Sequence, residues 1–278
     1  LRQRDAVSWN VLIAGYVEHG HWDRALLCFR RMEDEGISPN APTYDCVLQA
    51  CAATRSLDVG EEIHAKVRKL GLLKNDVVLG NRLIDMYAKC GMLQTACKVF
   101  EELPHRNVVS WNALIAGYIK HGFADQALKC FRQLEDAGIP PNAVTYVSVL
   151  KACSNSRALE PGRLLHSQAV EDGYHEAEFV LNSLVDMYSK CGNLGDAWRV
   201  FSDVSKPSLV RCNAMIEGFA DCGNSNEAFQ IFLGMGDLGL QPDKATFIII
   251  LKACCTTSNL EPGKAIHSHI IRSGCNLD

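Results

Sequence analysis

The chain repeats itself with a period of about one hundred residues, and this constrains its fold more than any other feature. The sequence LIDMYAKCG, which begins at Leu83, returns as LVDMYSKCG at Leu184, 101 positions later. SWNVLIAGY begins at Ser8, SWNALIAGY at Ser110, and the related RCNAMIEGF at Arg211. Repetition of this kind indicates an array of similar structural units rather than a single globular core.

Each long period divides into three units of about 35, 36 and 31 residues, so that eight units fill residues 6 to 278. Asn10 is the fifth residue of the first unit. The fifth residues of the seven other units are Asp45, Asn81, Asn112, Val147, Asn182, Asn213 and Ile248. Residues 1–5 read as the tail of a ninth unit.

Each unit reads as two helices separated by a glycine. In the first unit, Trp9, Leu12, Ile13 and Tyr16 share one helical face, and Ala25, Phe29 and Met32 share a second. The sequence GISPN then predicts a helix stop, because glycine suits the left-handed residue after a helix and proline prevents its continuation. A pair of this size cannot bury its apolar faces alone. The predicted fold is therefore an all-α solenoid of eight helix-turn-helix repeats, about sixteen helices.

Composition excludes several classes of function. A formal net charge of −4 argues against a polycation that grips nucleic acid by charge alone. No apolar run is long enough to predict a transmembrane helix. The thirteen Cys contain no Cys-x-x-Cys pair, and most lie in apolar helical patterns, as Cys28, Cys90, Cys130 and Cys191 do. We expect these thiols to be reduced and buried.

The sequence carries no signature of catalysis or of a metal site. A phosphate-binding loop, a nucleophile elbow and the H-x-E and P-C-x-x-C signature of zinc deaminases are all missing. His64, His166 and His267 recur with the long period, but His267 and His269 are two positions apart and face different sides of a helix. We expect no catalytic residues, no metal, no cofactor and no enzyme activity in this chain. Since it does not begin with Met, we expect it to be part of a longer protein.

These units resemble the pentatricopeptide repeat, most clearly in VVSWNALIAGYIKHGFADQALKCFRQLEDAGIPPN, residues 108–142. The rhythm of lengths is similar to the plant PLS class of that family, and the resemblance implies a right-handed solenoid. It assigns P motifs to 6–40, 108–142 and 209–243, L motifs to 41–76, 143–177 and 244–278, and S motifs to 77–107 and 178–208. The alternative is the tetratricopeptide repeat, a uniform 34-residue scaffold for protein or peptide partners, which fits this rhythm less well.

The resemblance implies that the chain reads one RNA base per unit with the fifth and last residues of each motif. The predicted P and S pairs are Asn10 with Asn40, Asn81 with Asn107, Asn112 with Asn142, Asn182 with Ser208, and Asn213 with Asp243. Apolar second residues sandwich the bases in the family. Here they are Val7, Val78, Val109, Phe179 and Val210, for which packing between units is an equal and compatible interpretation.

The chemistry of these pairs fits pyrimidines. An amide both donates and accepts, whereas a carboxylate only accepts, so a last-position Asp favours uracil N3–H and a last-position Asn tolerates cytosine. A single Asn10 could simply be a polar first-turn residue behind a Ser8 N-cap. Five Asn at one motif position favour the functional interpretation.

The L motifs contribute less to the predicted readout. Their pairs are Asp45 with Asp76, which we rank as weak, Val147 with Ala177, and Ile248 with Asp278. The resulting target is C, any base, C, C, any base, pyrimidine, U, any base. The resemblance further implies single-stranded RNA as the ligand, editing accessory proteins or a deaminase as partners, no membrane, a mitochondrial or chloroplast location, and the site-recognition part of C-to-U editing.

Overall fold

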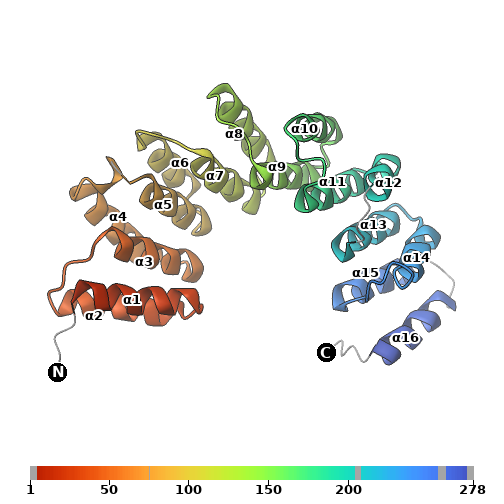
Figure 1. The fold of residues 1–278 in the computed structure, drawn as a ribbon, viewed down its shortest axis with the longest axis horizontal. Helices are drawn as coiled ribbons and strands as arrows, with labels where there is room; N and C mark the ends of the chain where they lie inside the picture. Colours follow the sequence, from red (N-terminus) through yellow and green to blue (C-terminus); the bar gives the residue numbers. More distant parts are fainter. Residues whose placement is uncertain (1–4, 75, 204–207, 256–260, 274–278) are drawn as a thin grey trace. The chain divides into compact units, whose positions relative to one another are not determined.

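The computed structural model describes residues 5–74, 76–203, 208–255 and 261–273, and within them the chain forms sixteen α-helices, one short 3-10 helix and no β-strand (Figure 1). The α-helices are α1 (Ala6–Glu18), α2 (Trp22–Asp34), α3 (Ala41–Thr54), α4 (Leu57–Lys69), α5 (Val77–Lys89), α6 (Leu93–Glu102), α7 (Val108–Lys120), α8 (Ala124–Asp136), α9 (Ala143–Ser156), α10 (Leu159–Glu171), α11 (Glu178–Lys190), α12 (Leu194–Ser202), α13 (Leu209–Asp221), α14 (Ser225–Gly234), α15 (Lys244–Cys255) and α16 (Glu261–Ser273), and η1 is Leu72–Lys74. The prediction of an all-α fold built from eight helix pairs is confirmed.

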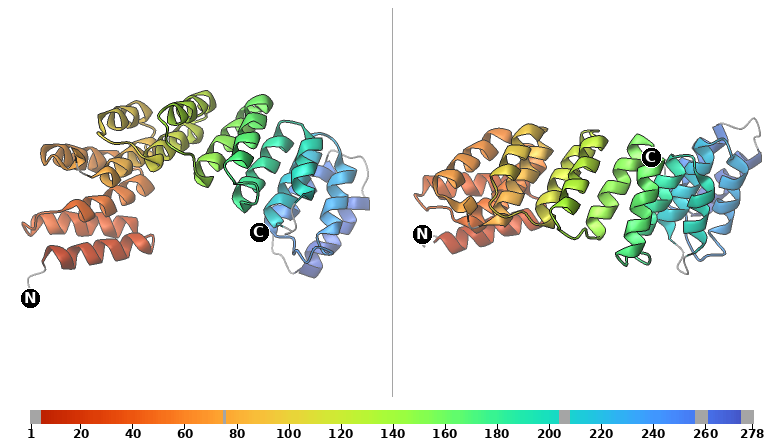
Figure 2. Two further views of the ribbon diagram at one scale, coloured as in Figure 1. Left: turned by 45° about the horizontal axis from the view of Figure 1, so that its top comes forward. Right: turned by 90° about the horizontal axis from the view of Figure 1, so that it is seen from above.

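The chain forms two compact halves of four helix pairs each, Leu1–Pro141 and Asn142–Asp278. In the N-terminal half the odd-numbered helices α1, α3, α5 and α7 lie side by side, and each even-numbered helix packs against its own partner (Figures 1 and 2). In the C-terminal half α9, α11, α13 and α15 form the equivalent row. The even-numbered helices α2, α4, α6, α10, α12 and α14 also contact the next odd-numbered helix, which buries the apolar faces between successive pairs.

The two apolar stripes of each unit meet in the core. Trp9 and Ile13 on α1 are buried, as are Ala25, Phe29 and Met32 on α2. The helices of a pair therefore bury the faces that the sequence periodicity assigned to them. Cys28 and Cys130 are buried, whereas Cys90 and Cys191 are only half-buried, so the expectation of burial is correct for part of the set.

The repeated glycine stop ends helices where the sequence predicts. The helix α5 ends at Lys89, and Gly91 two residues later has a φ of +84°. Gly192 after α11 has a φ of +75°. A side chain at either position would be strained, which explains why the phrase ends in Gly both times. Among the described residues, no helix is both long and apolar enough to cross a membrane.

A second kind of glycine lets neighbouring first helices approach closely. A Cβ added to Gly117 on α7 would lie 2.7 Å from Ala88 Cβ on α5, and one added to Gly218 on α13 would lie 2.4 Å from Ser189 Cβ on α11. Gly15, the equivalent residue of α1, has nothing within 4 Å of such a Cβ. Neighbouring first helices thus approach closely where an S motif would precede a P motif.

Candidate nucleic-acid interface

The last residue of most units is also the N-cap of the next helix. The side chain of Asn40 accepts a hydrogen bond from Thr43 N at the start of α3, Asp76 caps α5, Asn107 caps α7 and Asn142 caps α9 in the same way. Asp5 caps α1 by accepting from Ser8 N, so the interpretation of Ser8 as the N-cap is wrong. Ser8 lies inside the first turn because the cap belongs to the preceding unit.

In the first unit a threonine hydroxyl joins the fifth residue to the last. Asn10 Nδ2 donates to Asn40 Oδ1 at 3.0 Å. Thr43 Oγ1 lies 2.5 Å from Asn10 Oδ1 and 2.8 Å from Asn40 Oδ1. The carbonyl oxygen of Asn40 is therefore occupied by the helix cap and by Asn10. Its amide nitrogen, which makes no intramolecular hydrogen bond in the described residues, is the group that remains to donate to a ligand.

The seventh unit repeats this arrangement with a carboxylate. Thr246 N donates to Asp243 Oδ1 at 2.8 Å, and Thr246 Oγ1 lies 2.8 Å from both Asp243 Oδ1 and Asn213 Oδ1. The hydrogen bond from the Thr246 backbone is the main cause that lowers the pKa of Asp243 below its ordinary value. Asp243 is thus held as an anion that can only accept, the reverse polarity of the Asn40 amide.

The third and sixth units bring their predicted pairs together more loosely. Asn81 Nδ2 lies 3.4 Å from Asn107 Oδ1, and Asn107 Oδ1 also caps α7. Asn81 is almost fully buried, and its Oδ1 has no hydrogen-bond partner. Ser208 Oγ lies 3.4 Å from Asn182 Oδ1, and Ser208 makes no side-chain cap. The predicted pair of the fourth unit is Asn112 and Asn142, and one of these residues belongs to each half of the structure.

The apolar second residues are exposed rather than packed between helices. Their exposed fractions run from 53% to 76%, in the set Val7, Val78, Val109, Phe179 and Val210. Burial between units therefore does not account for these side chains. They lie in the first turns of α1, α5, α7, α11 and α13, three residues before the fifth-position side chains and hence near the same helical face.

The L motifs differ from this pattern. Asp45 accepts from Arg82 Nε at 2.7 Å, and Asp76 caps α5. The fifth and last residues of this repeat are both carboxylates, which only accept and so do not hydrogen-bond each other. Val147 and Ala177 offer no side-chain hydrogen bond, and Asp278 lies outside the described residues. Ile248 is exposed.

The hydroxyl partners Thr43 and Thr246 were missed at the sequence level, as was Arg82. The hydroxyls could have been found, because NAPT and DKAT each place a threonine three residues after a capping side chain, which is the spacing of a capping box. Ser110 and Thr145 close equivalent boxes on Asn107 and Asn142. Arg82 has no such local signal, because its partner lies 37 residues away.

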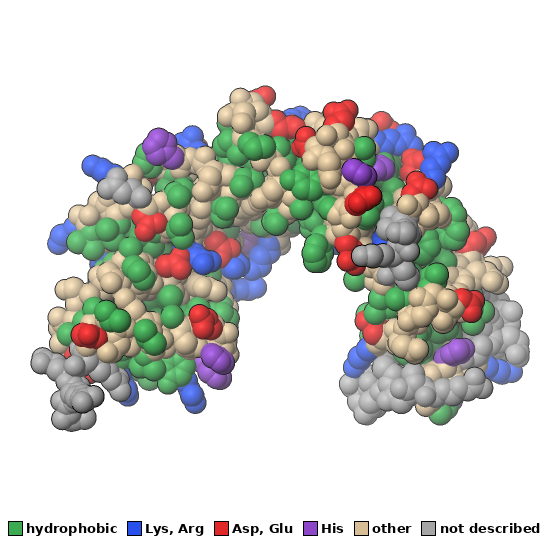
Figure 3. Space-filling model, in the orientation of Figure 1, with side chains coloured by type: hydrophobic (Ala, Val, Ile, Leu, Met, Phe, Trp, Pro, Cys, Tyr) green, Lys and Arg blue, Asp and Glu red, His purple; other side chains and the backbone are tan. Residues whose placement is uncertain are grey.

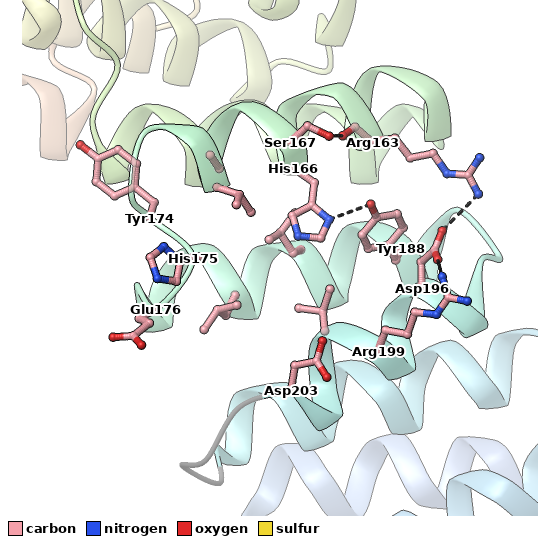
Figure 4. Close-up of a pocket in the computed structure, with 15 residues that line it drawn as sticks. Arg163, His166, Ser167, Tyr174, His175, Glu176, Tyr188, Asp196, Arg199 and Asp203 are labelled. Carbon is pink, nitrogen blue, oxygen red and sulfur yellow. Dashed lines mark hydrogen bonds and ion pairs between the residues drawn. The ribbon is translucent and has the colours of Figure 1, made fainter.

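A cavity of about 620 Å³ lies in the C-terminal half, between α10, α11 and α12 (Figure 4). His166 Nδ1 is 2.9 Å from Tyr188 Oη, and Asp196 lies between Arg163 and Arg199 at 3.1 and 3.3 Å. His64 and Tyr87 form the same bond at 2.9 Å in the N-terminal half. Both bonds join the second helix of one pair to the first helix of the next. No cluster of three metal-ligating side chains occurs in the part of the chain that the structure describes.

The surface of the described residues carries charges of both signs. Acidic and basic side chains are interspersed over the face shown in Figure 3. Several of the cations are neutralised by neighbours, as in Lys190 with Asp186 at 2.6 Å and Lys89 with Asp85 at 2.7 Å. The surface therefore offers hydrogen-bonding and apolar groups more readily than a field of positive charge.

Comparison with known proteins identifies the repeat. A model of the PPR repeat family matches residues 4–53, 106–155 and 207–256, and a PPR repeat model matches 81–108 and 179–206. A pentatricopeptide repeat-containing protein of Arabidopsis thaliana is 37% identical over 267 residues, which is 96% of this chain and 32% of that protein. A chloroplastic member from the same plant is 36% identical over 98% of this chain and 33% of its own length. Another is named as mitochondrial.

A solved structure has the same fold. The pentatricopeptide repeat protein PPR10, in complex with an 18-nt psaJ RNA element, superposes with a TM-score of 0.82 at 21% identity, over 99% of this chain and 41% of that one. The chain spans about a third of the length of the curated relatives that it matches. The family models alone match more than half of its residues. The chain belongs to the pentatricopeptide repeat family.

Proposed function

We propose that this chain binds single-stranded RNA and reads about one base per repeat, with the P, L and S motifs arranged as the sequence lengths indicate. The observation that carries the proposal is the contact between fifth and last residues across each of four units, as in Asn10 with Asn40. A polar pair that recurs with the repeat, beside exposed apolar side chains, is suited to a ligand with the same repeat. Stacked bases with hydrogen-bonding edges are such a ligand.

The helix caps explain how a last-position Asn and Asp would select different bases. Capping occupies one oxygen of Asn40 and of Asp243. The remaining group is an amide donor in Asn40 and a carboxylate acceptor in Asp243. A donor matches the cytosine N3 acceptor, and an acceptor matches uracil N3–H. We therefore assign C to the first, third and fourth bases, a pyrimidine to the sixth, and U to the seventh.

The wider role follows from the relatives. PPR10 was solved with RNA, and several Arabidopsis relatives are named chloroplastic or mitochondrial. We propose that the parent protein acts in one of these organelles and that this chain supplies the RNA-site recognition for C-to-U editing, with a deaminase and accessory proteins as partners. No catalytic residue is proposed in this chain.

The test is a titration of the chain with the eight-base RNA CACCACUA and with a version in which its five pyrimidines are purines. We expect the first RNA to bind at least tenfold more tightly, since each good base contact contributes roughly 1–3 kcal/mol. Equal affinities would contradict base reading. An RNA of matched composition in scrambled order is the control for nonspecific binding.

A further inference from the structure

The second unit contains a polar pair that differs from every other pair in the described residues. Its fifth residue, Asp45 on α3, accepts from Arg82 Nε on α5 at 2.7 Å. Its last residue, Asp76, is engaged in capping α5 through Leu79 N at 3.0 Å. The partner of the fifth residue is therefore a guanidinium from the following unit and not the last residue of its own.

The pair lies in the row of residues that we assign to base reading. Arg82 directly follows Asn81, the fifth residue of the third unit, and α3 and α5 lie side by side. The side chains of Arg82 and Asp45 are 38% and 28% exposed. Both groups are thus accessible to a ligand, and each keeps hydrogen-bonding atoms beyond the one contact that joins them.

The two side chains together present a pattern that guanine matches with both carboxylate oxygens and the guanidinium in use. A carboxylate offers two acceptors, and the guanidinium beside it offers donors. Guanine presents the complement on its Watson–Crick edge, with N1–H and N2–H donors next to the O6 acceptor. Uracil has a single donor between two acceptors, and cytosine and adenine each have one amino donor beside a ring-nitrogen acceptor, so these three bases engage one carboxylate oxygen where guanine engages two. An unstacked base in single-stranded RNA exposes this edge to a protein.

The chain contains its own comparison site. The residues equivalent to Asp45 and Arg82 in the fifth unit are Val147 and Ser183, which cannot form this pair. The helices that carry them, α9 and α11, pack together as α3 and α5 do. Packing of this helix pair therefore does not require an ion pair, and exposed ion pairs contribute little to stability.

We propose that Asp45 and Arg82 read guanine at the second base of the RNA, so that this L motif is specific where the sequence pattern alone assigns any base. The inference rests on the proposed function, because it assumes that the fifth-position row contacts bases. It adds Arg82 as a specificity-determining residue.

The test uses four RNAs that differ only at the second base and four that differ only at the seventh. We expect the wild-type chain to bind guanine at the second base about tenfold more tightly than the other three bases, the scale of a good base contact. Arg82→Ala should abolish that preference and keep the preference for U at the seventh base. The double substitution Val147→Asp with Ser183→Arg should create a guanine preference at the fifth base.

The outcomes separate the two proposals. Indifference of the wild-type chain at the second base, with the seventh base still discriminated, would overturn the reading by Asp45 and Arg82 alone. A uniform loss of affinity for all four RNAs in Arg82→Ala would do the same and would make Arg82 a phosphate contact. Indifference at both bases would overturn the proposed function as well. If Arg82→Ala does not fold, as judged by circular dichroism, the wild-type titration and the double substitution still decide.

Discussion

At the scale of single residues, the seventh unit offers the clearest separation of capping from base reading. Asp243 caps α15 through Oδ1, and Asn213 is joined to it through the Thr246 hydroxyl and by a hydrogen bond of its own side chain. A change at position 213 therefore alters the reading pair without removing the cap. This unit is the best place to test the code by substitution.

Asn213→Thr should change the preferred seventh base from U to G. Threonine is shorter than asparagine and leaves room for a purine, its hydroxyl donates or accepts, and Thr with Asp selects G in the code that the family resemblance implies. Position 213 lies inside α13, where Thr costs only about a few tenths of a kcal/mol. Titration against four RNAs that differ at that base should reveal a change in preference of roughly 1–3 kcal/mol. A folded variant that ranks the bases as wild type does would show that position 213 does not read RNA.

The residue scale also marks the limit of sequence reasoning. The fifth and last positions could be predicted because the repeat makes them recur, and the Thr43 hydroxyl could have been inferred from capping-box spacing. The Asp45–Arg82 pair could not, because it joins residues 37 apart across two helices and occurs in only one of the L motifs that the structure describes. A local pattern does not report which side chains meet across a stack.

At the scale of helices, Gly117 and Gly218 allow neighbouring first helices to approach closely. A substitution at Gly218, compared with the same substitution at Gly15, tests this. Gly218→Ala should destabilise the chain by about 1–3 kcal/mol, because its Cβ would lie 2.4 Å from Ser189 Cβ and 3.2 Å from Ser189 Cα. Gly15→Ala, where the space is open, should instead stabilise α1 by up to about 1 kcal/mol. Urea unfolding measures both changes. Similar effects of the two substitutions would contradict the close approach.

The histidine–tyrosine bonds between successive helix pairs predict a pH dependence of stability. Burial lowers the pKa of His64 and of His166 below the ordinary value of 6.5, although Glu102 and Asp196 oppose the shift. The unfolded chain therefore binds more protons as the pH falls below about 6.5. The contribution of the neutral imidazoles is complete above that pH and is lost as the pH falls through the folded pKa values.

Unfolding midpoints in urea at pH 7.5 and pH 5 should expose this loss. The double substitution of His64 and His166 to Gln keeps a hydrogen-bonding group for Tyr87 and Tyr188 but removes the titration, so its decrease between the two pH values should be smaller than that of wild type. The exposed His105→Gln is the control and should behave as wild type. An unchanged decrease in the double variant would assign the pH dependence to other groups.

At the scale of the whole molecule, repetition in the sequence was enough to predict the stacked helix pairs, because a unit that cannot bury its own apolar face must stack on a neighbour. The same repetition does not fix the target, since two L motifs have Val147 and Ile248 at the fifth position. Specificity for the RNA sequence then depends on a subset of the eight bases. Long-range electrostatic attraction to the RNA is the remaining contribution to affinity, and the charge of the chain determines its size.

The salt dependence of RNA binding should be shallow. The formal net charge is −4, and cations such as Lys190 and Lys89 already pair with Asp186 and Asp85 at 2.6 and 2.7 Å. Because acidic residues outnumber basic ones and part of the cations is already paired, log affinity should fall with log salt far less steeply than the slope of about −10 found for a strongly basic repressor. The affinity for the eight-base target, measured at salt concentrations from about 50 to about 200 mM, tests this.

Asp186→Asn should release Lys151 and Lys190 from their carboxylate partner and make the slope steeper, whereas Asp136→Asn, on an exposed part of α8, should not. A steep slope in the wild-type chain would mean that phosphate contacts, and not base contacts, carry the binding.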